Sequence, residues 1–572
     1  MILQALCAYY ERKAADPTSG IAPFGWERKE IPYLLVLDRA GRLLNVEDTQ
    51  ERVGKTLRAK VFLIAQAVKR ASGVAANFLW DNTEYVTGLP CKAKAKPERV
   101  AQQHAAFLAR LTPYAELPSV RAVLTLLAAP DLADQLARFP AWAEAQKACA
   151  FITFRFADAE GTLFDEAEVR RAVEAEACSD AEPCRDLVSG ERGPLARLHP
   201  SLKGIPGANT TGASIVAFNF GAANSFGKRQ GANAPVSERS AFAYTTALNM
   251  LLGKDSRQKL TVGDAVAVFW SEKADAFEDS LLGFLDEPST DDPDALVENV
   301  RALFTSPQSG APDFEGDATR FFVLGLSPNS ARVAIRFWHV GTVSEMAQRF
   351  REYFTDLQIC HGPNEREHLS LKRLLLATAA QSKFDNIIPT LAGEVMRSLL
   401  EGLPFPETLL LALLRRIKAE REITYPRAKL IKGFLNRKAR FANPHQERFL
   451  TVSLDPTNAN IGYRLGRLFA VLERIQEAAN PGLNATIRDK FYAAASATPV
   501  VAFGNLVRLA QAHLAKLRKE KPGYGVVLEK AVQEILSGIN RFPAHLPLDD
   551  QGQFAIGYYH QRQDFFEKKV DA

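Results

Sequence analysis

The sequence predicts an α+β protein, with antiparallel strands in its N-terminal part and an α-helical bundle in its C-terminal part. Up to about residue 357 strand-like runs alternate with helix-like stretches, and after about residue 365 only helical spacing remains. The 572 residues are 47% hydrophobic and 24% charged, which suits packed cores and excludes disordered, collagen-like and coiled-coil classes. We therefore expect two domains, residues 1–357 and 358–572.

Short turns mark the clearest strands of the N-terminal part. The run Pro32–Leu37 is followed by the glycine-containing turn Asp38–Gly41 and a second apolar run, which together predict a β-hairpin. The same pattern predicts a strand at Phe151–Phe156 with a turn at Asp158–Gly161, and a further strand is expected at Ala265–Trp270. We expect these strands to pair in antiparallel fashion.

One more strand has the period of two that is typical of a half-exposed position. It covers residues 331–338, and its apolar and basic side chains alternate. The residues of the two faces are Val333, Ile335 and Phe337 on one and Arg332 and Arg336 on the other.

Apolar residues at spacings of three and four predict the helices. In the N-terminal part these helices are rich in Ala and Leu and cover Val100–Leu111 and Ser119–Leu136. In the C-terminal part they cover Leu369–Ala380, Ile387–Leu400, Glu407–Lys418, Tyr463–Ala478, Pro499–Glu520 and Val526–Ile539. Turns rich in Gly and Pro, at Gly402–Pro406 and Pro522–Gly525, separate helices of this bundle.

Charge is unevenly distributed, although the net charge is only +5. Residues 411–450 contain eleven Lys or Arg and three Glu, a local net charge of +8, whereas residues 271–300 contain ten Asp or Glu and one Lys, a net charge of −9. The basic segment also carries Phe434 and Phe441. Its composition is typical of a nucleic-acid surface, because each neutralised phosphate releases condensed counterions. A solvated helix face is the alternative.

Several classes of protein are disfavoured by what the sequence lacks. Its apolar runs fall short of the roughly 18 residues that a membrane-spanning helix needs, and no basic segment precedes the apolar N-terminus, so we expect a cytoplasmic protein. Six cysteines are too few for a disulfide scaffold and are expected to be reduced thiols. Phosphate-binding, His-Glu-x-x-His and Gly-x-Ser-x-Gly motifs do not occur, so we expect no enzyme, no cofactor and no metal. A three-ligand zinc site from Cys178, Cys184 and His199 stays open as an alternative.

Residues 204–235 form an unusual polar stretch, in which six glycines accompany amide, hydroxyl and basic side chains. Glycine lets the backbone approach a ligand closely, amide side chains can bond N6 and N7 of adenine, and Arg or Lys can bond O6 and N7 of guanine. Such a loop can read base pairs in a duplex. An ordinary turn-rich connection is the alternative.

Residues 55–88 form a second stretch of interest, because five cations precede a run that contains Phe78, Trp80 and Tyr85. Cations beside exposed Trp80 or Tyr85 would suit phosphate binding and base stacking. The alternative places Phe78 and Trp80 in the core.

Five groups of residues occur in order along the chain. They are Lys69–Asn82, the run from Gly207–Ser214 through Asn233–Glu238 to Ala243–Asn249, Val323–Asn329, Tyr463–Phe469 and Gly557–Gln561. Together they resemble the large subunit of the type I-C CRISPR Cascade complex, and the resemblance covers essentially the whole chain.

The resemblance implies a non-catalytic subunit of an RNA-guided surveillance complex in antiviral defence. A guide RNA reads the target by base pairing, while the large subunit recognises the short protospacer-adjacent motif (PAM) in duplex DNA, promotes R-loop formation and supports recruitment of a helicase-nuclease. The N-terminal domain is then expected near the guide's 5′ handle and the backbone subunits, and the C-terminal bundle resembles a Cascade small subunit. The implied partners are CRISPR RNA, double-stranded target DNA, its displaced single strand, backbone and handle-binding subunits, a small subunit and the helicase-nuclease, with no membrane.

Three groups of candidate residues follow from the composition and the resemblance together. For the PAM duplex they are Asn209, Thr210, Thr211, Asn224, Ser225, Lys228, Gln230 and Asn233. For the guide handle or phosphates they are Lys55, Arg58, Lys69, Arg70 and Asn77. For the displaced strand they are Arg415, Arg416, Lys429, Lys432, Arg437, Lys438 and Arg440.

The resemblance also implies a second product, since the type I-C small subunit arises by internal translation within the large-subunit gene. No Met stands near the start of the corresponding segment, so initiation there would use a non-ATG codon, with Val452 as the candidate. Two rival functions stay open: a nuclease that cuts its nucleic-acid partner, and a purely architectural subunit without DNA contact.

Overall fold

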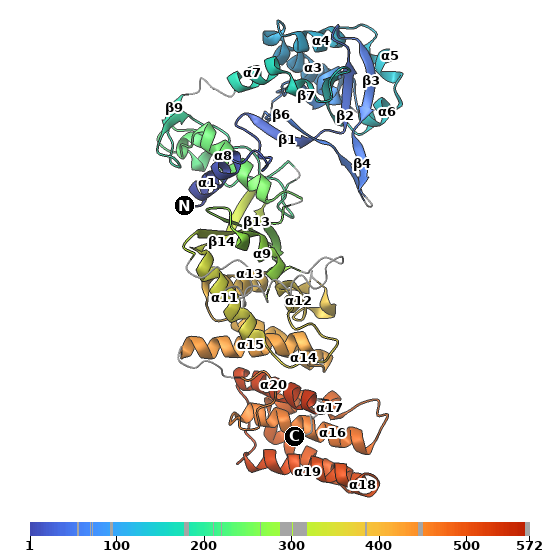
Figure 1. The fold of residues 1–572 in the computed structure, drawn as a ribbon, viewed down its shortest axis with the longest axis vertical. Helices are drawn as coiled ribbons and strands as arrows, with labels where there is room; N and C mark the ends of the chain where they lie inside the picture. Colours follow the sequence, from blue (N-terminus) through green and yellow to red (C-terminus); the bar gives the residue numbers. More distant parts are fainter. Residues whose placement is uncertain are drawn as a thin grey trace. The chain divides into compact units, whose positions relative to one another are not determined.

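The structure is a computed structural model. It describes residues 1–53, 56–68, 70, 73–91, 95–176, 182–209, 211–218, 220–254, 256–262, 265–286, 300, 317–383, 386–443 and 450–566. The chain forms two compact units (Figure 1). The first comprises Met1–Gly204, Asn209–Gly253 and Ser330–Arg332, and the second comprises Ile205–Ala208, Lys254–Asn329 and Val333–Ala572.

The first unit contains a four-stranded sheet of order β3-β2-β8-β7. Its strands are β2 (Tyr33–Leu37), β3 (Leu43–Asp48), β7 (Trp80–Asn82) and β8 (Phe151–Phe156). Strands β2 and β3 pair antiparallel, and Gly41 between them has φ +88°, so the predicted hairpin and its glycine turn are confirmed. The sheet shares one apolar core with most of the helices around it.

The other elements of the first unit are short helices and three two-stranded pairs. The helices are α1 (Ile2–Ala14), α2 (Thr83–Thr87), α3 (Pro97–Leu111), α4 (Pro118–Leu127), α5 (Leu132–Ala137), α6 (Pro140–Lys147), α7 (Ala167–Glu176) and α8 (Glu238–Leu251). The pairs are β1 (Trp26–Glu30) with β6 (Val61–Ala65), β4 (Gln50–Val53) with β5 (Thr56–Ala59), and β9 (Pro183–Arg185) with β10 (Arg192–Pro194).

The second unit combines a sheet with the predicted helices. Its sheet has the order β11-β12-β13-β14, from β11 (Lys259–Val262), β12 (Ala265–Ser271), β13 (Arg320–Asn329) and β14 (Arg332–Thr342). Its helices are α9 (Ala276–Leu285), α11 (Val343–Leu357), α12 (Leu371–Leu376), α13 (Pro389–Glu401), α14 (Glu407–Glu420), α15 (Tyr425–Ala442), α16 (Ile461–Ala479), α17 (Ile487–Ala497), α18 (Pro499–Glu520), α19 (Pro522–Ser537) and α20 (Leu548–Asp564). The predicted α+β class is thus confirmed. The expected boundary at residue 357 coincides with the end of α11, and it lies inside this second unit.

The expected antiparallel pairing was wrong for one pair of strands. Strand β8 pairs in parallel with β2, and its other neighbour is β7. The residues after β8 lead into a short 3₁₀ helix, Leu163–Asp165, instead of the return strand of a hairpin. The long connection from β2 to β8, which includes α3 to α6, allows the crossover that parallel strands need.

Three further expectations differ from the structure in detail. The predicted helix at residues 119–136 is split into α4 and α5. The predicted turn Pro522–Gly525 is the first turn of α19, where a proline at the first helical position loses no intrahelical hydrogen bond. In β14 the side chain of Phe337 is buried but that of Ile335 is 44% exposed, because β14 is an edge strand of the described sheet.

Two of the motifs behind the resemblance pack against each other as a helix pair. Gly466 lies in α16 and Gly557 in α20. A Cβ atom on Gly466 would lie 2.0 Å from the Phe554 carbonyl oxygen, and one on Gly557 would lie 2.1 Å from the Tyr463 carbonyl oxygen. Glycine is therefore required on both helices for their backbones to approach this closely.

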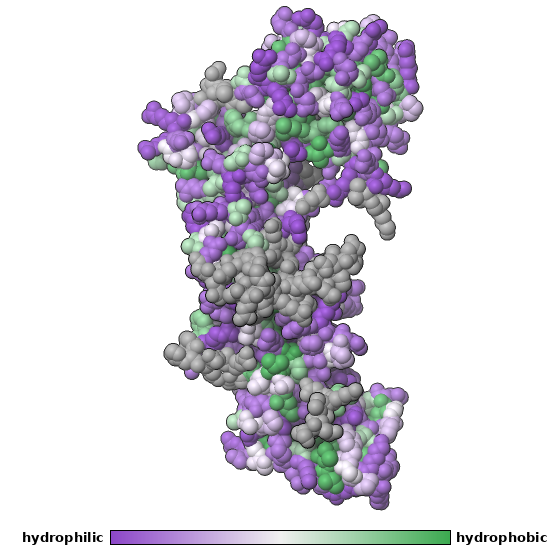
Figure 2. All heavy atoms as spheres, viewed as in Figure 1, coloured by the Kyte–Doolittle hydropathy of each residue, from purple (hydrophilic) through white to green (hydrophobic). Residues whose placement is uncertain are grey.

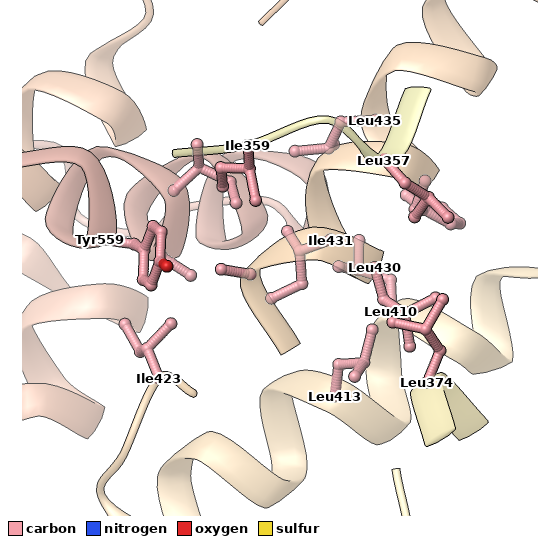
Figure 3. Packing of buried hydrophobic residues seen from close by; sticks show 14 of the residues in the cluster. Leu357, Ile359, Leu374, Leu410, Leu413, Ile423, Leu430, Ile431, Leu435 and Tyr559 are labelled. Carbon is pink, nitrogen blue, oxygen red and sulfur yellow. The ribbon is translucent and has the colours of Figure 1, made fainter. Parts of the chain in front are cut away.

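The sheet and helices of the second unit share one apolar core. Figure 3 shows part of it, where Leu410 and Leu413 of α14 and Ile431 of α15 lie close together. Tyr559 of α20 points into the same region, and its hydroxyl donates to the Cys360 carbonyl oxygen at 3.0 Å. Helix α20 therefore packs against α14 and α15, so that helices α16 to α20 do not form a separate core.

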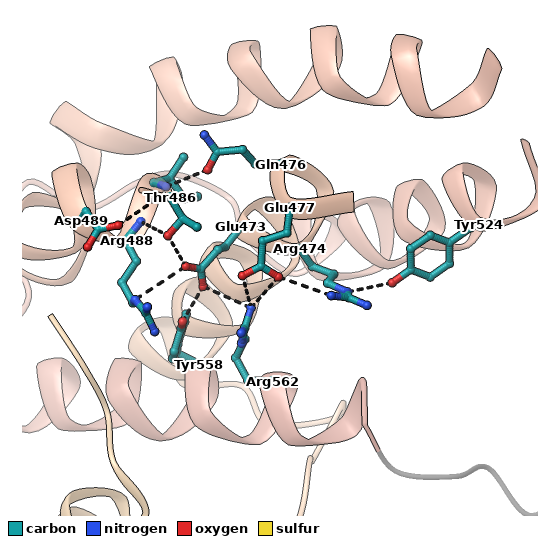
Figure 4. Close-up of polar contacts among 11 residues, drawn as sticks. Glu473, Arg474, Gln476, Glu477, Thr486, Arg488, Asp489, Tyr524, Tyr558 and Arg562 are labelled. Atoms are coloured by element: carbon teal, nitrogen blue, oxygen red, sulfur yellow. Dashed lines mark hydrogen bonds and ion pairs between the residues drawn. The ribbon is translucent and has the colours of Figure 1, made fainter. Parts of the chain in front are cut away.

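One carboxylate is fully buried among α16, α17 and α20. Glu473 accepts hydrogen bonds from the Tyr558 hydroxyl and, at 2.5 Å, from the Thr486 hydroxyl (Figure 4). The guanidinium groups of Arg488 and Arg562 lie 3.7 and 3.5 Å from it. This network satisfies a charge that would be costly to bury alone.

On the face drawn in Figure 2, hydrophilic side chains predominate and apolar areas are interspersed among them. Within the described residues, no helix combines the length and apolar character that crossing a membrane requires.

Candidate nucleic-acid interface

One amide side chain organises the polar loop of the first unit. Asn233 ends a short 3₁₀ helix, Gln230–Asn233, and its Oδ1 accepts a hydrogen bond from the Ser225 amide at 3.0 Å. Its Nδ2 donates to the carbonyl oxygens of Lys228 at 3.3 Å and Gln230 at 3.0 Å. The amide of Asn233 is thus engaged within the loop, where it fixes the segment between residues 225 and 230.

The tip of this loop presents one aromatic ring and two cations to solvent. Phe226 is 97% exposed and has φ +51°, a left-handed conformation that is strained for a bulky residue. Lys228 and Arg229 follow it and are also exposed. Phe226 was not predicted as a candidate, and Arg229 was predicted only as one of the basic side chains of the polar stretch.

The other candidates for the PAM duplex occupy the same polar stretch. Asn209 and Thr211 are exposed at a turn in which the Gly212 amide donates to the Asn209 carbonyl oxygen at 2.9 Å. Asn224 and Ser225 are exposed and Gln230 is half-buried. Thr210 lies outside the described residues.

The second stretch of interest is mostly interior. Trp80 and Tyr85 are only 1% and 2% exposed, so the expected base stacking on these rings was wrong and the core placement is confirmed for Phe78 and Trp80. The indole nitrogen of Trp80 donates to the Ala65 carbonyl oxygen at 2.8 Å. Strand β7 is an edge strand whose Trp80 side chain packs into the core, so the cations that precede it do not lie beside exposed rings.

The candidate residues for guide-handle binding differ in how far they are buried and in what they contact. Arg70 forms an ion pair with the fully buried Asp81, and its guanidinium carbon lies 4.1 Å from the centre of the Tyr85 ring. Asn77 is buried, and its Oδ1 accepts a hydrogen bond from the Val68 amide at 2.9 Å. Arg58 is half-buried on β5. Lys55 and Lys69 lie outside the described residues.

Helix α15, at the centre of the basic segment, has four of its cations in the interior, namely Arg427, Lys429, Lys432 and Arg437. The ammonium group of Lys429 donates to the Glu367 carbonyl oxygen at 2.8 Å, and that of Lys432 donates to the Asp356 carbonyl oxygen at 3.4 Å. Arg437 donates to the carbonyl oxygens of Leu403 and Ser398. Burial, reinforced by the neighbouring Lys432, lowers the pKa of Lys429 to about 7, and burial lowers the pKa of Arg437 to about 10.

The remaining candidates of the basic segment lie nearer the surface. Arg416 is 3.7 Å from Glu420, and Lys438 is 2.9 Å from Asp549. Arg440 forms ion pairs with Asp356 and Glu352. Arg415 is exposed on α14, without an ion pair among the residues that the structure describes. Of the acidic segment, residues 271–286 and 300 are described and residues 287–299 are not.

One group of side chains in the described part of the chain has the composition of a metal site. It consists of Glu84, Cys91 and Cys149, whose ligand atoms lie within 4.8 Å of one another. Cys178 lies outside the described residues, and a ring nitrogen of His199 lies 2.6 Å from the Tyr244 hydroxyl.

One family of known proteins matches nearly the whole chain. Residues 6–566 match the family described as CRISPR-associated protein (Cas_Csd1), which defines the class as a CRISPR-associated subunit of Cascade. The chain belongs to this Csd1 family. None of the curated proteins compared with the sequence matches it.

Proposed function

We propose that this chain is the non-catalytic large subunit of a type I-C Cascade complex and that it recognises the PAM in double-stranded DNA through the loop of residues 224–233. The observation that carries the proposal is the loop tip, where Phe226 is almost fully exposed beside two exposed cations. The match of nearly the whole chain to a CRISPR-associated family supports the assignment of this chain to a CRISPR complex.

The side chains at the tip have the chemistry that reading and opening a duplex require. Lys228 and Arg229 are suited to O6 and N7 of guanine or to phosphate, and the amides of Asn224 and Gln230 are suited to adenine. An apolar side chain that inserts between base steps unstacks them and bends the duplex, and Phe226 is placed to act in this way. Asn209 and Thr211 are exposed in the same polar stretch, and they are proposed to contact the same duplex together with Thr210. Asn233 then acts indirectly, because its hydrogen bonds fix the conformation of the loop.

The C-terminal helices are proposed to hold the displaced strand, and we assign two roles to the basic residues of α14 and α15. Arg415 and Lys438 are accessible to phosphates, whereas Lys429 and Arg437 bind backbone carbonyl groups of the surrounding segments. Replacing Arg415 by alanine should therefore reduce the salt dependence of DNA binding by up to about 0.9 in slope for the lost phosphate contact.

An internal product from Val452 fits the arrangement of the second unit. Val452 is 37% exposed in the segment between α15 and α16, and the residues after it include α16 to α20. In the part of the chain that the structure describes, such a small subunit would be all-helical. Any valine codon other than GTG at position 452 in the nucleotide sequence would count against this start.

The decisive experiment uses the assembled complex with its guide RNA and a target duplex that carries 2-aminopurine next to the PAM. Phe226→Ala should abolish the fluorescence rise that reports base unstacking while leaving guide-RNA binding intact. Lys228→Ala and Gln230→Ala should relax the preference for PAM-bearing over PAM-altered duplex. Phe566→Ala removes an exposed ring elsewhere and is the control. Unchanged unstacking and unchanged motif preference in the three loop variants would refute the proposal.

The assembled complex with its guide RNA and target duplex also distinguishes the proposed function from the two rival functions. A nuclease would cleave the duplex in the presence of Mg²⁺ without a helicase-nuclease partner. A purely architectural subunit would leave the complex equally selective after replacement of the whole loop tip. The proposed partners, namely CRISPR RNA, the backbone and handle-binding subunits and the helicase-nuclease, can be checked by co-purification.

A further inference from the structure

We propose that Glu84, Cys91 and Cys149 form a binding site for a thiophilic divalent cation, with zinc as the expected ion. The two sulfur atoms and a carboxylate oxygen lie within 4.8 Å of one another, and all three residues are half-buried. In a tetrahedral zinc site, with Zn–S distances of about 2.3 Å and Zn–O distances of about 2.0–2.2 Å, ligand atoms are roughly 3.5–3.8 Å apart. Small side-chain movements therefore suffice to close the three ligands around an ion.

Hydrogen bonds hold the two sequence-distant parts of this site together. The Thr83 amide donates to the Ala150 carbonyl oxygen at 3.1 Å, which ties the start of α2 to the residue after Cys149. On the other side, the side-chain amide of Gln146 donates to the Pro90 carbonyl oxygen at 3.0 Å, next to Cys91. The ligands are thus positioned by the backbone before any ion binds, which lowers the entropic cost of assembling the site.

The carboxylate of Glu84 beside the two sulfur atoms favours a bound cation over a disulfide between Cys91 and Cys149. Glu84 Oε1 accepts a hydrogen bond from the Cys91 amide at 3.1 Å, so its carboxylate is held beside the sulfur atoms. A disulfide would gain nothing from this negative charge, whereas two thiolates and one carboxylate complete three positions of a zinc coordination shell and leave the fourth to water. On binding, each thiol releases its proton to solvent as its sulfur bonds the ion.

The surroundings of Cys149 and Cys91 also favour a positive charge. Cys149 follows α6, and its amide donates to the Gln146 carbonyl oxygen at the C-terminal end of this helix, where the helix dipole is negative. It adopts φ +49°, a conformation in which a helix usually ends on glycine, so the backbone does not favour a cysteine at this position. The Thr83 hydroxyl lies 2.9 Å from the Cys91 sulfur and can donate a hydrogen bond to a metal-bound thiolate.

Titration of the full-length, reduced, metal-free chain with Co²⁺ tests the site. We expect one Co²⁺ per chain, with a thiolate-to-cobalt charge-transfer band in the near ultraviolet and the intense visible bands of tetrahedral cobalt, and Zn²⁺ should abolish both by displacement. Cys91→Ser and Cys149→Ser should lose the charge-transfer band. Glu84→Gln should weaken Co²⁺ binding by roughly tenfold or more, since even outer-shell partners of metal ligands contribute that much. Cys184→Ser, a half-exposed cysteine outside the site, is the matched control and should leave the spectrum unchanged.

A second measurement needs no variant and keeps the proposal testable if a variant fails to fold. Zn²⁺ should protect Cys91 and Cys149 of the wild-type chain from alkylation, read by mass spectrometry of the peptides, while Cys184 stays reactive. The proposal would be overturned by the absence of the charge-transfer band in the wild-type chain, by its persistence in the Cys91→Ser variant, or by unprotected Cys91 and Cys149. Formation of a Cys91–Cys149 disulfide by a chain that binds neither ion would overturn it as well. The proposed PAM recognition can fail or hold independently of every one of these results.

Discussion

Replacing Gly466 by alanine should destabilise the second unit, because this glycine lets α16 and α20 approach backbone to backbone. The added Cβ atom would lie 2.0 Å from the Phe554 carbonyl oxygen and 2.8 Å from the Tyr558 amide nitrogen. Both atoms belong to the backbone of α20 and cannot rotate away as a side chain can. The two helices would have to move apart along a contact that extends over much of their length.

The expected magnitude follows from two opposing terms. The contact is roughly 1.4 Å shorter than the ordinary van der Waals distance of 3.4 Å, so we place the overpacking cost near the upper end of its usual range, about 3 kcal/mol. Alanine is favoured over glycine in a helix by about 1 kcal/mol. The net loss is therefore about 2 kcal/mol, which corresponds to a fall of about 3 °C in the melting temperature of a unit of this size.

Thermal unfolding followed by far-ultraviolet circular dichroism measures this change. Gly504→Ala is the matched control, because it introduces the same methyl group into α18 at a position where no atom lies within 4 Å of the new Cβ atom. That variant should gain up to about 1 kcal/mol. If Gly466→Ala were as stable as the wild-type chain or gained as much as Gly504→Ala, the close approach of α16 and α20 would be refuted.

Three further predictions concern buried ionisable groups of the second unit. Glu473→Gln should lower the free energy of urea unfolding by about 1–3 kcal/mol, because the half-buried Arg488 loses this carboxylate and Arg562 keeps only Glu477, and a loss below this range would contradict the network. Burial lowers the pKa of His560 to about 3, so the unfolded chain binds more protons below pH 6.5. The free energy of unfolding should therefore be highest above pH 6.5 and fall by up to about 1.4 kcal/mol per pH unit as the pH decreases toward 3. Urea unfolding at pH 7 and at pH 5 measures this fall, which should be smaller for His560→Phe than for the wild-type chain. An equal fall in both would exclude His560 as the cause. Lys429→Met should lower the free energy of unfolding by about 1–3 kcal/mol, because the Glu367 carbonyl oxygen loses its hydrogen-bond donor. The salt dependence of DNA binding should stay unchanged in this variant. A changed salt dependence would mean that Lys429 contacts phosphate.

The pattern of apolar residues predicted several of the long helices and some of the strands. Residues 499–520 were predicted as a helix with the same bounds as α18, and the hairpin of β2 and β3 was predicted from its glycine turn. Helices α15, α17 and α20 were missed. In α15 basic side chains occupy buried positions, so the polar and apolar faces that reveal an amphipathic helix are not distinct in its sequence.

The candidate interface was predicted less completely, because composition does not report exposure. Lys228 and Asn233 are neighbours in one polar loop, yet the first is exposed and the second is engaged by hydrogen bonds within it. Phe226 was missed, since an aromatic residue is usually buried and nothing local says otherwise.

The sequence by itself determined the fold class, the bounds of the strongly periodic elements and the family, because all three depend on local pattern and residue identity. Only the tertiary structure decided which cations of the basic segment are interior, as Lys429 is, and which are exposed, as Arg415 is. It also brought Cys91 beside Cys149, which nothing in their separate surroundings along the chain predicts. Burial and long-range proximity arise from the packing of distant segments, so they follow from the sum of many weak contacts and are not encoded at any one position.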